Sequence, residues 1–144
     1  MTRAHEIAGQ ITLAALGVIY LALGASGVLD PRGAAELAGM QAHSSTALVE
    51  LRSAFGLYLG LAALFFFSAA IKIHLQAVLI SALFVNIGLL GGRIFGAALD
   101  GLTEPISIYS GLVEAAACAV VGTVLWQRAS AASKLECTTG GDSR

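Results

Sequence analysis

Four long apolar stretches are the feature that most constrains how this chain can fold. The first, Ile7 to Leu29, contains no charged residue, and three more run from about Leu48 to Ile71, Leu75 to Leu99 and Pro105 to Trp126. A bilayer core about 30 Å thick is crossed by about 20 apolar residues in a helix. Apolar and polar residues do not alternate, as they would in membrane-spanning strands. The sequence therefore predicts an all-α fold, an integral membrane antiparallel four-helix bundle over residues 1–126, with a flexible cytoplasmic tail at 127–144.

Composition supports this prediction and excludes other classes of protein. Hydrophobic residues make up 57% of the 144 residues and charged residues only 12%, about half the charged share of a soluble domain, which is about 25%. The net charge is −1, so the chain lacks the basic surface that binds nucleic acid. Neither an ordinary water-soluble fold nor a nucleic-acid-binding protein is compatible with these values.

The connections between the stretches differ in character. Asp30-Pro31-Arg32-Gly33 has the composition of a turn, and Ala34 to Met40 could form one short interfacial helix. The connection Lys72-Ile73-His74 is so short that the second and third spans should be antiparallel neighbours. Pro105 suits the first position of the fourth helix, where its missing N–H leaves no hydrogen bond unmade.

Lysine and arginine in short loops set the expected orientation, because they accumulate on the cytoplasmic side. One side would carry five basic residues and the other two, which favours both termini in the cytoplasm; the five are Arg3, Lys72, Arg128, Lys134 and Arg144, and the two are Arg32 and Arg52. A cleaved signal peptide is the competing interpretation for residues 1–25, although the apolar segment is long and its basic region thin for a signal.

Small residues, most of them glycines, recur at helical spacing in every span. In lipid, small residues let helix backbones approach closely. Candidate packing residues are Gly56, Gly60, Gly88, Gly92, Gly96 and Gly111, with Gly17, Gly24 and Gly27 in the first span. They predict close packing within the bundle or against another subunit, and less often the approach of a backbone to a ligand.

Ionisable and amide side chains inside the spans are the candidate site residues: Glu50, Arg52, Arg93, Asp100, Glu114 and Asn86. At 1.5 Å per residue, Arg93 would lie about 9 Å and Glu114 about 14 Å deep, on the same side of the membrane as Glu50 and Arg52. Buried charges cost less when paired, so two acids and two bases there predict one network. Asn86, Arg93 and Asp100 are seven residues apart and share a face of the third span.

Three interpretations of this polar cluster remain open. The network could join three helices and fix their register. It could instead line an outward-facing pocket, where an arginine holds an anionic headgroup or carboxylate or a glutamate carries a proton. Some members could simply extend to the interface. Neutral hydrogen bonds to a pocket could come from Tyr58, Tyr109, Asn86 and Ser107.

At these residues the sequence resembles the DUF4345 family of small bacterial four-span membrane proteins. The resemblance rests on Glu50-Leu51-Arg52-Ser53-Ala54-Phe55-Gly56, Gly92-Arg93, Asp100-Gly101 and Glu114, and it covers residues 7–126. Leu57 stands where the family commonly has a second glycine, which weakens a ligand role for that turn. The resemblance implies a four-helix protein of the bacterial cytoplasmic membrane and draws attention to the same polar residues. It implies no reaction.

Two functions of different class fit the sequence. The first is an accessory or lipid-binding subunit that packs against a larger membrane assembly or against itself, with membrane lipid as a further partner. The alternative is a membrane-embedded enzyme that acts on a lipid or isoprenoid, with Glu50 or Glu114 carrying a proton and Arg52 and Arg93 steering charge; an oligomeric channel is a third possibility. No catalytic motif, metal-ligand spacing or cofactor motif is present in the sequence, so no metal or cofactor is expected and catalytic residues stay unassigned.

Overall fold

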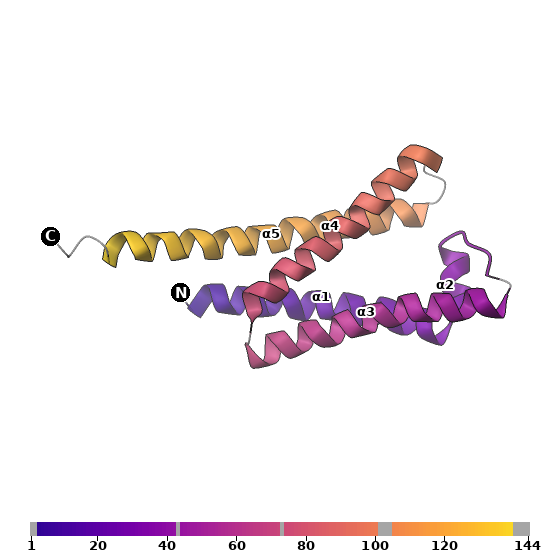
Figure 1. Ribbon diagram of the computed structural model, residues 1–144, viewed down its shortest axis with the longest axis horizontal. Coiled ribbons are helices and arrows are strands. Elements are labelled where there is room, and N and C mark those ends of the chain that lie inside the picture. The colour runs from indigo at the N-terminus through magenta and orange to yellow at the C-terminus, as the bar shows by residue number, and fades with distance from the viewer. Residues whose placement is uncertain (1–2, 43, 73, 101–104, 140–144) are drawn as a thin grey trace.

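A computed structural model describes residues 3–42, 44–72, 74–100 and 105–139, without the side chains of Asp100, Ile106, Ser107 and residues 134–139. Every regular secondary-structure element in this part of the chain is an α-helix, which confirms the all-α prediction (Figure 1). The five helices are α1 (Arg3–Leu29), α2 (Pro31–Leu37), α3 (Ser45–Ile71), α4 (Leu75–Asp100) and α5 (Pro105–Thr139). All except α2 are long and apolar enough to cross a membrane, so the protein is of the multi-pass membrane type.

Local capping explains where α2 and α3 begin. The Asp30 carboxylate accepts a hydrogen bond from the Gly33 backbone N–H at 3.0 Å, and Pro31 occupies the first turn of α2. Ser44 caps α3 by accepting from the Ala47 N–H at 3.1 Å. The predicted short helix is therefore present, but it begins three residues earlier than expected because Asp30 and Pro31 together start it.

The four long helices form two pairs. Contacts are most extensive between α1 and α3 and then between α4 and α5, whereas α3 and α4 touch much less. In Figure 1, α4 leaves the end of α3 and runs obliquely away from it toward the start of α5. The short connection therefore makes α3 and α4 antiparallel, as predicted, but the main packing partner of α3 is α1.

Small residues on α1 produce its close packing with α3. A Cβ atom added to Gly17 would lie 3.0 Å from the Phe66 ring, and one added to Gly27 would collide with the ring of Phe55. Gln10 adds a hydrogen bond from its side-chain amide to the Ala69 carbonyl at 2.8 Å. The expectation that glycines of the first span mediate helix packing is confirmed.

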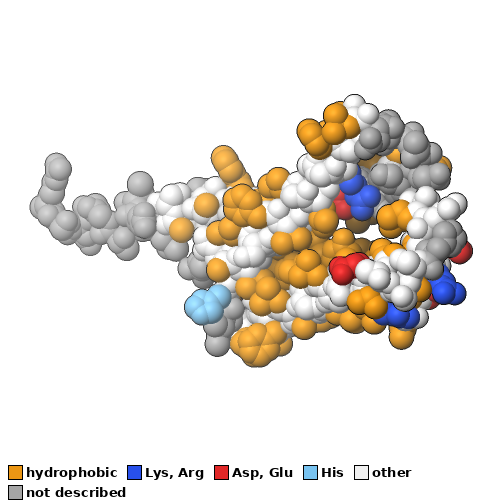
Figure 2. Space-filling view, turned by 45° about the vertical axis from the view of Figure 1, so that its right-hand side comes forward, with side chains coloured by type: hydrophobic (Ala, Val, Ile, Leu, Met, Phe, Trp, Pro, Cys, Tyr) orange, Lys and Arg blue, Asp and Glu red, His pale blue; other side chains and the backbone are white. Residues whose placement is uncertain are grey.

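The apolar core fills only one half of the molecule. Its members come from the middle of α1, the last part of α3, the first part of α4 and the middle of α5: Leu13, Leu16, Tyr20, Ala62, Phe65, Leu75, Val78, Leu79, Ala82, Val121 and Val124. Toward the end where α2 lies, here called the α2 end, the two pairs diverge (Figure 1). Figure 2 shows the surface hollowed between the pairs at that end, with charged side chains along the border. This opening is called the hollow below.

α5 is longer than the sequence predicts. Residues 127–139, expected to form a flexible tail, continue the helix to Thr139. This segment contains no glycine or proline before Gly140 and has three alanines, the residue with the highest helix propensity, at 129, 131 and 132. Arg128 anchors it, since its Nη1 donates to the His5 carbonyl of α1 at 3.2 Å.

Candidate functional site

An ion pair between α4 and α5 lies beside the hollow. The Arg93 Nε–H donates to both carboxylate oxygens of Glu114, each at 2.9 Å. The Glu114 side chain is 11% exposed and that of Arg93 is 36% exposed. The pair thus joins the two helices near the α2 end. The Glu114 side chain is largely buried, and the Arg93 side chain is partly exposed. The sequence placed these two residues at similar depth, and the structure brings them together.

Arg93 keeps hydrogen-bonding capacity in this arrangement. A guanidinium carries five N–H donors, and only the Nε–H is used among the residues that the structure describes. Gly111, one turn before Glu114 on α5, lies close to the aliphatic part of the side chain, because a Cβ there would be 3.9 Å from Arg93 Cδ. The guanidinium is therefore held at its Nε side, and its terminal nitrogens remain available.

A layer of polar side chains lies deeper, where all four long helices meet. Tyr20 of α1 is 3% exposed, and its ring stands edge-on to Tyr58 of α3 with centroids 5.6 Å apart. Its hydroxyl lies within electrostatic reach of Tyr58, Asn86, Glu114 and Cys118. Asn86 adjoins the hydroxyl, but the two do not reach hydrogen-bond geometry, so the Tyr20 oxygen is buried without a hydrogen-bond partner in the described structure.

Asn86 itself is bound within its own helix. It is 2% exposed, and its Nδ2 donates to the Ala82 carbonyl at 2.8 Å. A buried amide thus lies beside a buried hydroxyl and near Glu114 in this layer. The predicted face shared by Asn86 and Arg93 on α4 therefore points inward at both residues, whereas the Asp100 side chain lies outside the described residues.

The predicted network of two acids and two bases does not form. Glu50 is exposed and has no ion pair or hydrogen bond with any described residue. Arg52 is also exposed, and its Nε donates to the Val28 carbonyl near the end of α1 at 3.3 Å. The network is replaced by one ion pair, because the divergence of the helix pairs keeps α3 away from Arg93 and Glu114 at this level.

The open glycines do not pack within the chain. A Cβ added at Gly56, Gly60, Gly88, Gly92 or Gly96 would have no atom within 4 Å. The within-bundle alternative for these five residues is therefore wrong, since the helix faces that carry them are uncovered. Their contact with another subunit stays a prediction, and Gly111 is the member of the set that adjoins a side chain, that of Arg93.

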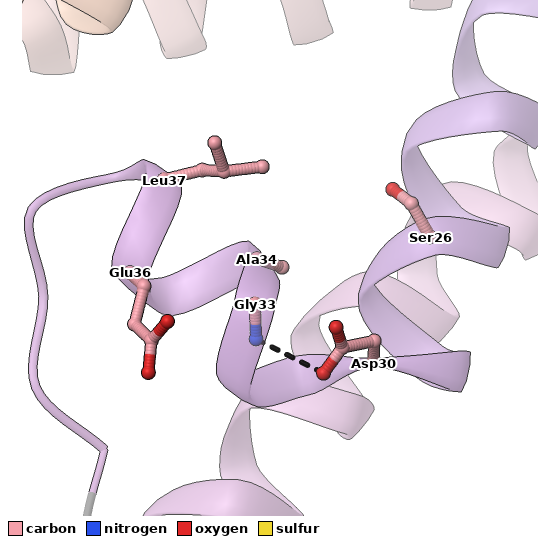
Figure 3. A pocket seen from close by; sticks show the side chains of 6 residues that line it. All are labelled: Ser26, Asp30, Gly33, Ala34, Glu36 and Leu37. Atoms are coloured by element: carbon pink, nitrogen blue, oxygen red, sulfur yellow. Dashed lines mark hydrogen bonds between the residues drawn. The ribbon is translucent and has the colours of Figure 1, made fainter.

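Two pockets lie at the α2 end, away from the ion pair. One, of about 430 Å³, is lined by Ser26, Asp30, Gly33, Ala34, Glu36 and Leu37 (Figure 3). Two of its polar side chains are occupied locally: Asp30 caps α2, and the Ser26 hydroxyl donates to the Leu23 carbonyl at 2.9 Å. The other, of about 450 Å³, is lined by Arg32, Glu36, Met40, Gln41 and Ala42. Among the described residues, neither pocket contains an ion pair, although Asp30 and Glu36 line the first and Arg32 and Glu36 the second. The ion pair beside the hollow is therefore the stronger candidate.

Metal binding finds no support in the described residues. They contain no group of three or more histidine, cysteine, aspartate or glutamate side chains that could hold an ion. Cys118, partly buried on α5, is a free thiol.

The comparison with protein families agrees with this arrangement. The family described as "Domain of unknown function (DUF4345)" matches residues 8–126, a range that contains α3, α4, most of α1, the first 22 residues of α5 and both residues of the ion pair. The chain belongs to the DUF4345 family. No curated protein and no solved structure shows a significant match.

Two polar residues of this DUF4345 protein were not anticipated from its sequence. Tyr20 lies in the middle of an uncharged span, and an aromatic hydroxyl far from the interface is the signal that could have identified it. From the sequence, Arg128 is only one of the basic residues expected on the cytoplasmic side. The structure places it between α1 and α5 at 6% exposure, because the longer α5 carries it alongside the start of α1.

Proposed function

We propose that this protein is a small lipid-binding protein of the membrane, which holds the anionic group of an amphiphile on Arg93 at the hollow. The observation that carries the proposal is that Arg93 is fixed through its Nε by Glu114 while its terminal nitrogens make no hydrogen bond with the described chain. An arginine in this state offers a planar pair of donors to a phosphate or carboxylate.

The surroundings of Arg93 suit an amphiphile better than a small soluble anion. The hollow is bordered by long apolar helices, and it opens between two helix pairs rather than into a pocket enclosed by loops (Figure 2). Acyl chains could pack along the uncovered apolar faces of α3 and α4, which carry exposed residues such as Leu57 and Phe84. The headgroup would then reach Arg93 from within the bilayer.

Native mass spectrometry of the protein in mild detergent tests this proposal. After delipidation, phosphatidylglycerol is added back, and the bound fraction is compared between the wild type and Arg93→Gln. Loss of a charge-assisted hydrogen-bond partner should weaken binding at least about tenfold. Arg32→Gln, an exposed charge on α2, is the matched control and should bind like the wild type. Equal lipid binding by Arg93→Gln and the wild type would reject the proposal.

A second proposal concerns a protein partner, and it is supported by the uncovered glycines. Gly56 and Gly92 present backbone that no part of the described chain covers, which is the surface that a helix of a larger membrane assembly would use. Leucine at either position would block such an approach. Gly56→Leu and Gly92→Leu should then release the partner in a detergent pull-down, and retention of an unchanged complex by both variants would reject the accessory role.

The proposed location is the bacterial cytoplasmic membrane, with both termini in the cytoplasm. Figure 1 supports a common side for the termini, because α1 begins and α5 ends at the same end of the molecule. Lys72, in the connection between α3 and α4, adds a basic residue at that end. Reporter fusions at each terminus that are active only in the cytoplasm test the orientation, and activity of one fusion alone would refute it.

A further inference from the structure

The ion pair beside the hollow lies within the membrane-spanning segments and not at their ends. Arg93 is six residues before the end of its span at Leu99, and Glu114 is six residues after the start of its span at Ile108. Each residue therefore lies about 9 Å along its helix from the end of the span. A charged side chain at such a position is costly unless it is paired or faces a water-filled space. The carboxylate of Glu114 is paired through both oxygens, whereas Arg93 uses one of its five N–H donors.

The terminal N–H groups of Arg93 need hydrogen-bond acceptors, because the acyl chains of lipids offer none. These groups make no hydrogen bond with a described residue, and the side chain is partly exposed. Long basic side chains often extend to the membrane surface, but the bond from Nε to Glu114 holds this one beside α5. The space next to Arg93 is therefore expected to contain polar acceptors.

The inward face of α4 changes from closed and apolar to open and polar toward the α2 end. Steps of three, four and seven residues return to the same side of a helix, so this face carries Leu79, Ala82, Asn86 and Arg93 in turn. Leu79 and Ala82 are 0% exposed, and Asn86 is 2% exposed. Only beyond Asn86 does exposure begin, since the Arg93 side chain is 36% exposed.

Three buried residues from three helices separate the hollow from the apolar core. Tyr20 of α1 stands edge-on to Phe65 of α3, with ring centroids 5.5 Å apart, and its hydroxyl adjoins Asn86 of α4. Each of the three is at most 3% exposed. These residues, Tyr20, Phe65 and Asn86, are called the floor of the hollow below. On α5, Val121 lies seven residues further toward the core than Glu114 and is 0% exposed.

We propose that the hollow is an aqueous vestibule, open on the α2 side of the membrane and closed at the floor. Water reaches the terminal N–H groups of Arg93 and stops at Tyr20 and Asn86, where the interior becomes apolar. Among the described helices, one chain then forms no continuous polar path across the membrane, and the polar group of any ligand of Arg93 enters from the α2 side. This inference does not depend on the lipid-binding proposal, because water solvates Arg93 whether or not an amphiphile binds.

Reaction of introduced cysteines with a membrane-impermeant thiosulfonate tests the vestibule, because the reactive thiolate is suppressed in apolar surroundings. The full-length protein carries Cys118→Ser and Cys137→Ser and is assayed in membrane vesicles. Gly111→Cys adds a thiol beside Arg93, where the new Cβ makes an ordinary contact of 3.9 Å with Arg93 Cδ. Val113→Cys, 50% exposed and about 200° around α5 from Gly111, is the matched control. Gly111→Cys should react at least about tenfold faster, and equal rates would overturn the proposal.

A second pair of variants on α4 keeps the test independent of the folding of one variant. Ala97 lies one turn beyond Arg93 on the same face and is partly buried, whereas Phe95 is 67% exposed and about 200° around the helix from Arg93. Ala97→Cys should react faster than Phe95→Cys by a similar factor. Slow reaction of both Ala97→Cys and Gly111→Cys would show that lipid chains fill the hollow, which contradicts the proposal.

The side from which the reagent acts tests the floor. Arg32→Cys, on the exposed surface of α2, identifies the α2 side in right-side-out and inverted vesicles. Gly111→Cys should react only from that side. Ala82→Cys, one turn from Asn86 toward the core and with the helix content of the wild type, should react from neither side. Reaction of Ala82→Cys as fast as that of Gly111→Cys, or reaction of Gly111→Cys from the other side, would overturn the closed vestibule.

Failure of this inference can be told apart from failure of the lipid-binding proposal. The lipid-binding proposal is tested by the loss of phosphatidylglycerol binding in Arg93→Gln, and the vestibule is tested by cysteine reaction rates without added lipid. Full lipid binding by Arg93→Gln together with fast, one-sided labelling of Gly111→Cys rejects the lipid site and supports the vestibule. Weakened lipid binding together with equal rates for Gly111→Cys and Val113→Cys gives the opposite result.

Discussion

The strength of the Arg93–Glu114 pair can be bounded from its geometry and burial. Exposed ion pairs contribute about 0–1 kcal/mol, and removing one partner of a buried pair costs about 3–5 kcal/mol. Here the glutamate side chain is 11% exposed, the arginine side chain is 36% exposed, and the Nε lies 2.9 Å from both oxygens. The pair lies between the two cases, so we expect a coupling free energy of about 2 kcal/mol, or about thirtyfold in the unfolding equilibrium.

A double-mutant cycle measures this coupling directly. Glu114→Gln, Arg93→Gln and the double variant are unfolded reversibly in mixed dodecylmaltoside–SDS micelles, and the loss of helix is followed by far-ultraviolet circular dichroism. The stability losses of the two single variants should add up to more than the loss of the double variant. The reason is that the second substitution removes a charge that the first has already left unpaired. Glu36→Gln is the control and should change stability by less than about 0.5 kcal/mol.

A coupling below about 0.5 kcal/mol would refute the reasoning. It would mean that the pair behaves as a solvated surface contact and that α4 and α5 are held together by apolar packing alone. The proposal that Glu114 fixes Arg93 for a ligand would then lose its physical basis, even if Arg93 proved to bind lipid.

Two further predictions use the same unfolding assay. Tyr20→Phe should stabilise the protein by up to about 1 kcal/mol, because it removes a buried hydroxyl with no hydrogen-bond partner in the described structure. A loss of more than about 1 kcal/mol in the free energy of unfolding would show that a water or ligand binds that oxygen. Gly27→Ala should cost about 1–3 kcal/mol, since its Cβ collides with the Phe55 ring. Gly92→Ala meets open space and should stabilise the protein by up to about 1 kcal/mol, because alanine favours the helix over glycine. Equal effects of the two glycine variants would contradict the packing described for α1 and α3.

The polar residues illustrate how far sequence reasoning could reach. Depth within a span depends on position along one helix, so the similar depths of Arg93 and Glu114 could be predicted from residue counting, whereas their direct pairing could not. Which charges meet across helices depends on how the helices diverge. The residues of any one segment do not determine that divergence. The sequence therefore grouped Glu50 and Arg52 with the pair, whereas the structure places Arg52 against Val28 and leaves Glu50 exposed, with no ion pair to a described residue.

The same division separates the two sets of glycines. Spacing alone marked both sets as close-packing residues, because a glycine at helical spacing has the same local pattern whether or not a helix lies against it. Gly17 and Gly27 meet α3, but Gly56 and Gly92 have no neighbour. The hydroxyl of Tyr20 was missed for a related reason, since burial of a single polar group inside an apolar span leaves no periodic pattern.

By itself, the sequence determined the number of long helices, their apolar character, their alternating direction and the existence of ionisable groups within them. These properties follow from segment length, hydropathy and connection length, which are local. The tertiary structure decided that α1 pairs with α3 and α4 with α5, and that the core occupies one half of the molecule. It also decided that Arg93 borders a hollow and that the terminal N–H groups of Arg93 make no hydrogen bond with the described residues. Those properties depend on how the side chains of segments far apart in the chain fit together. That fit exists only once the helices are packed against each other.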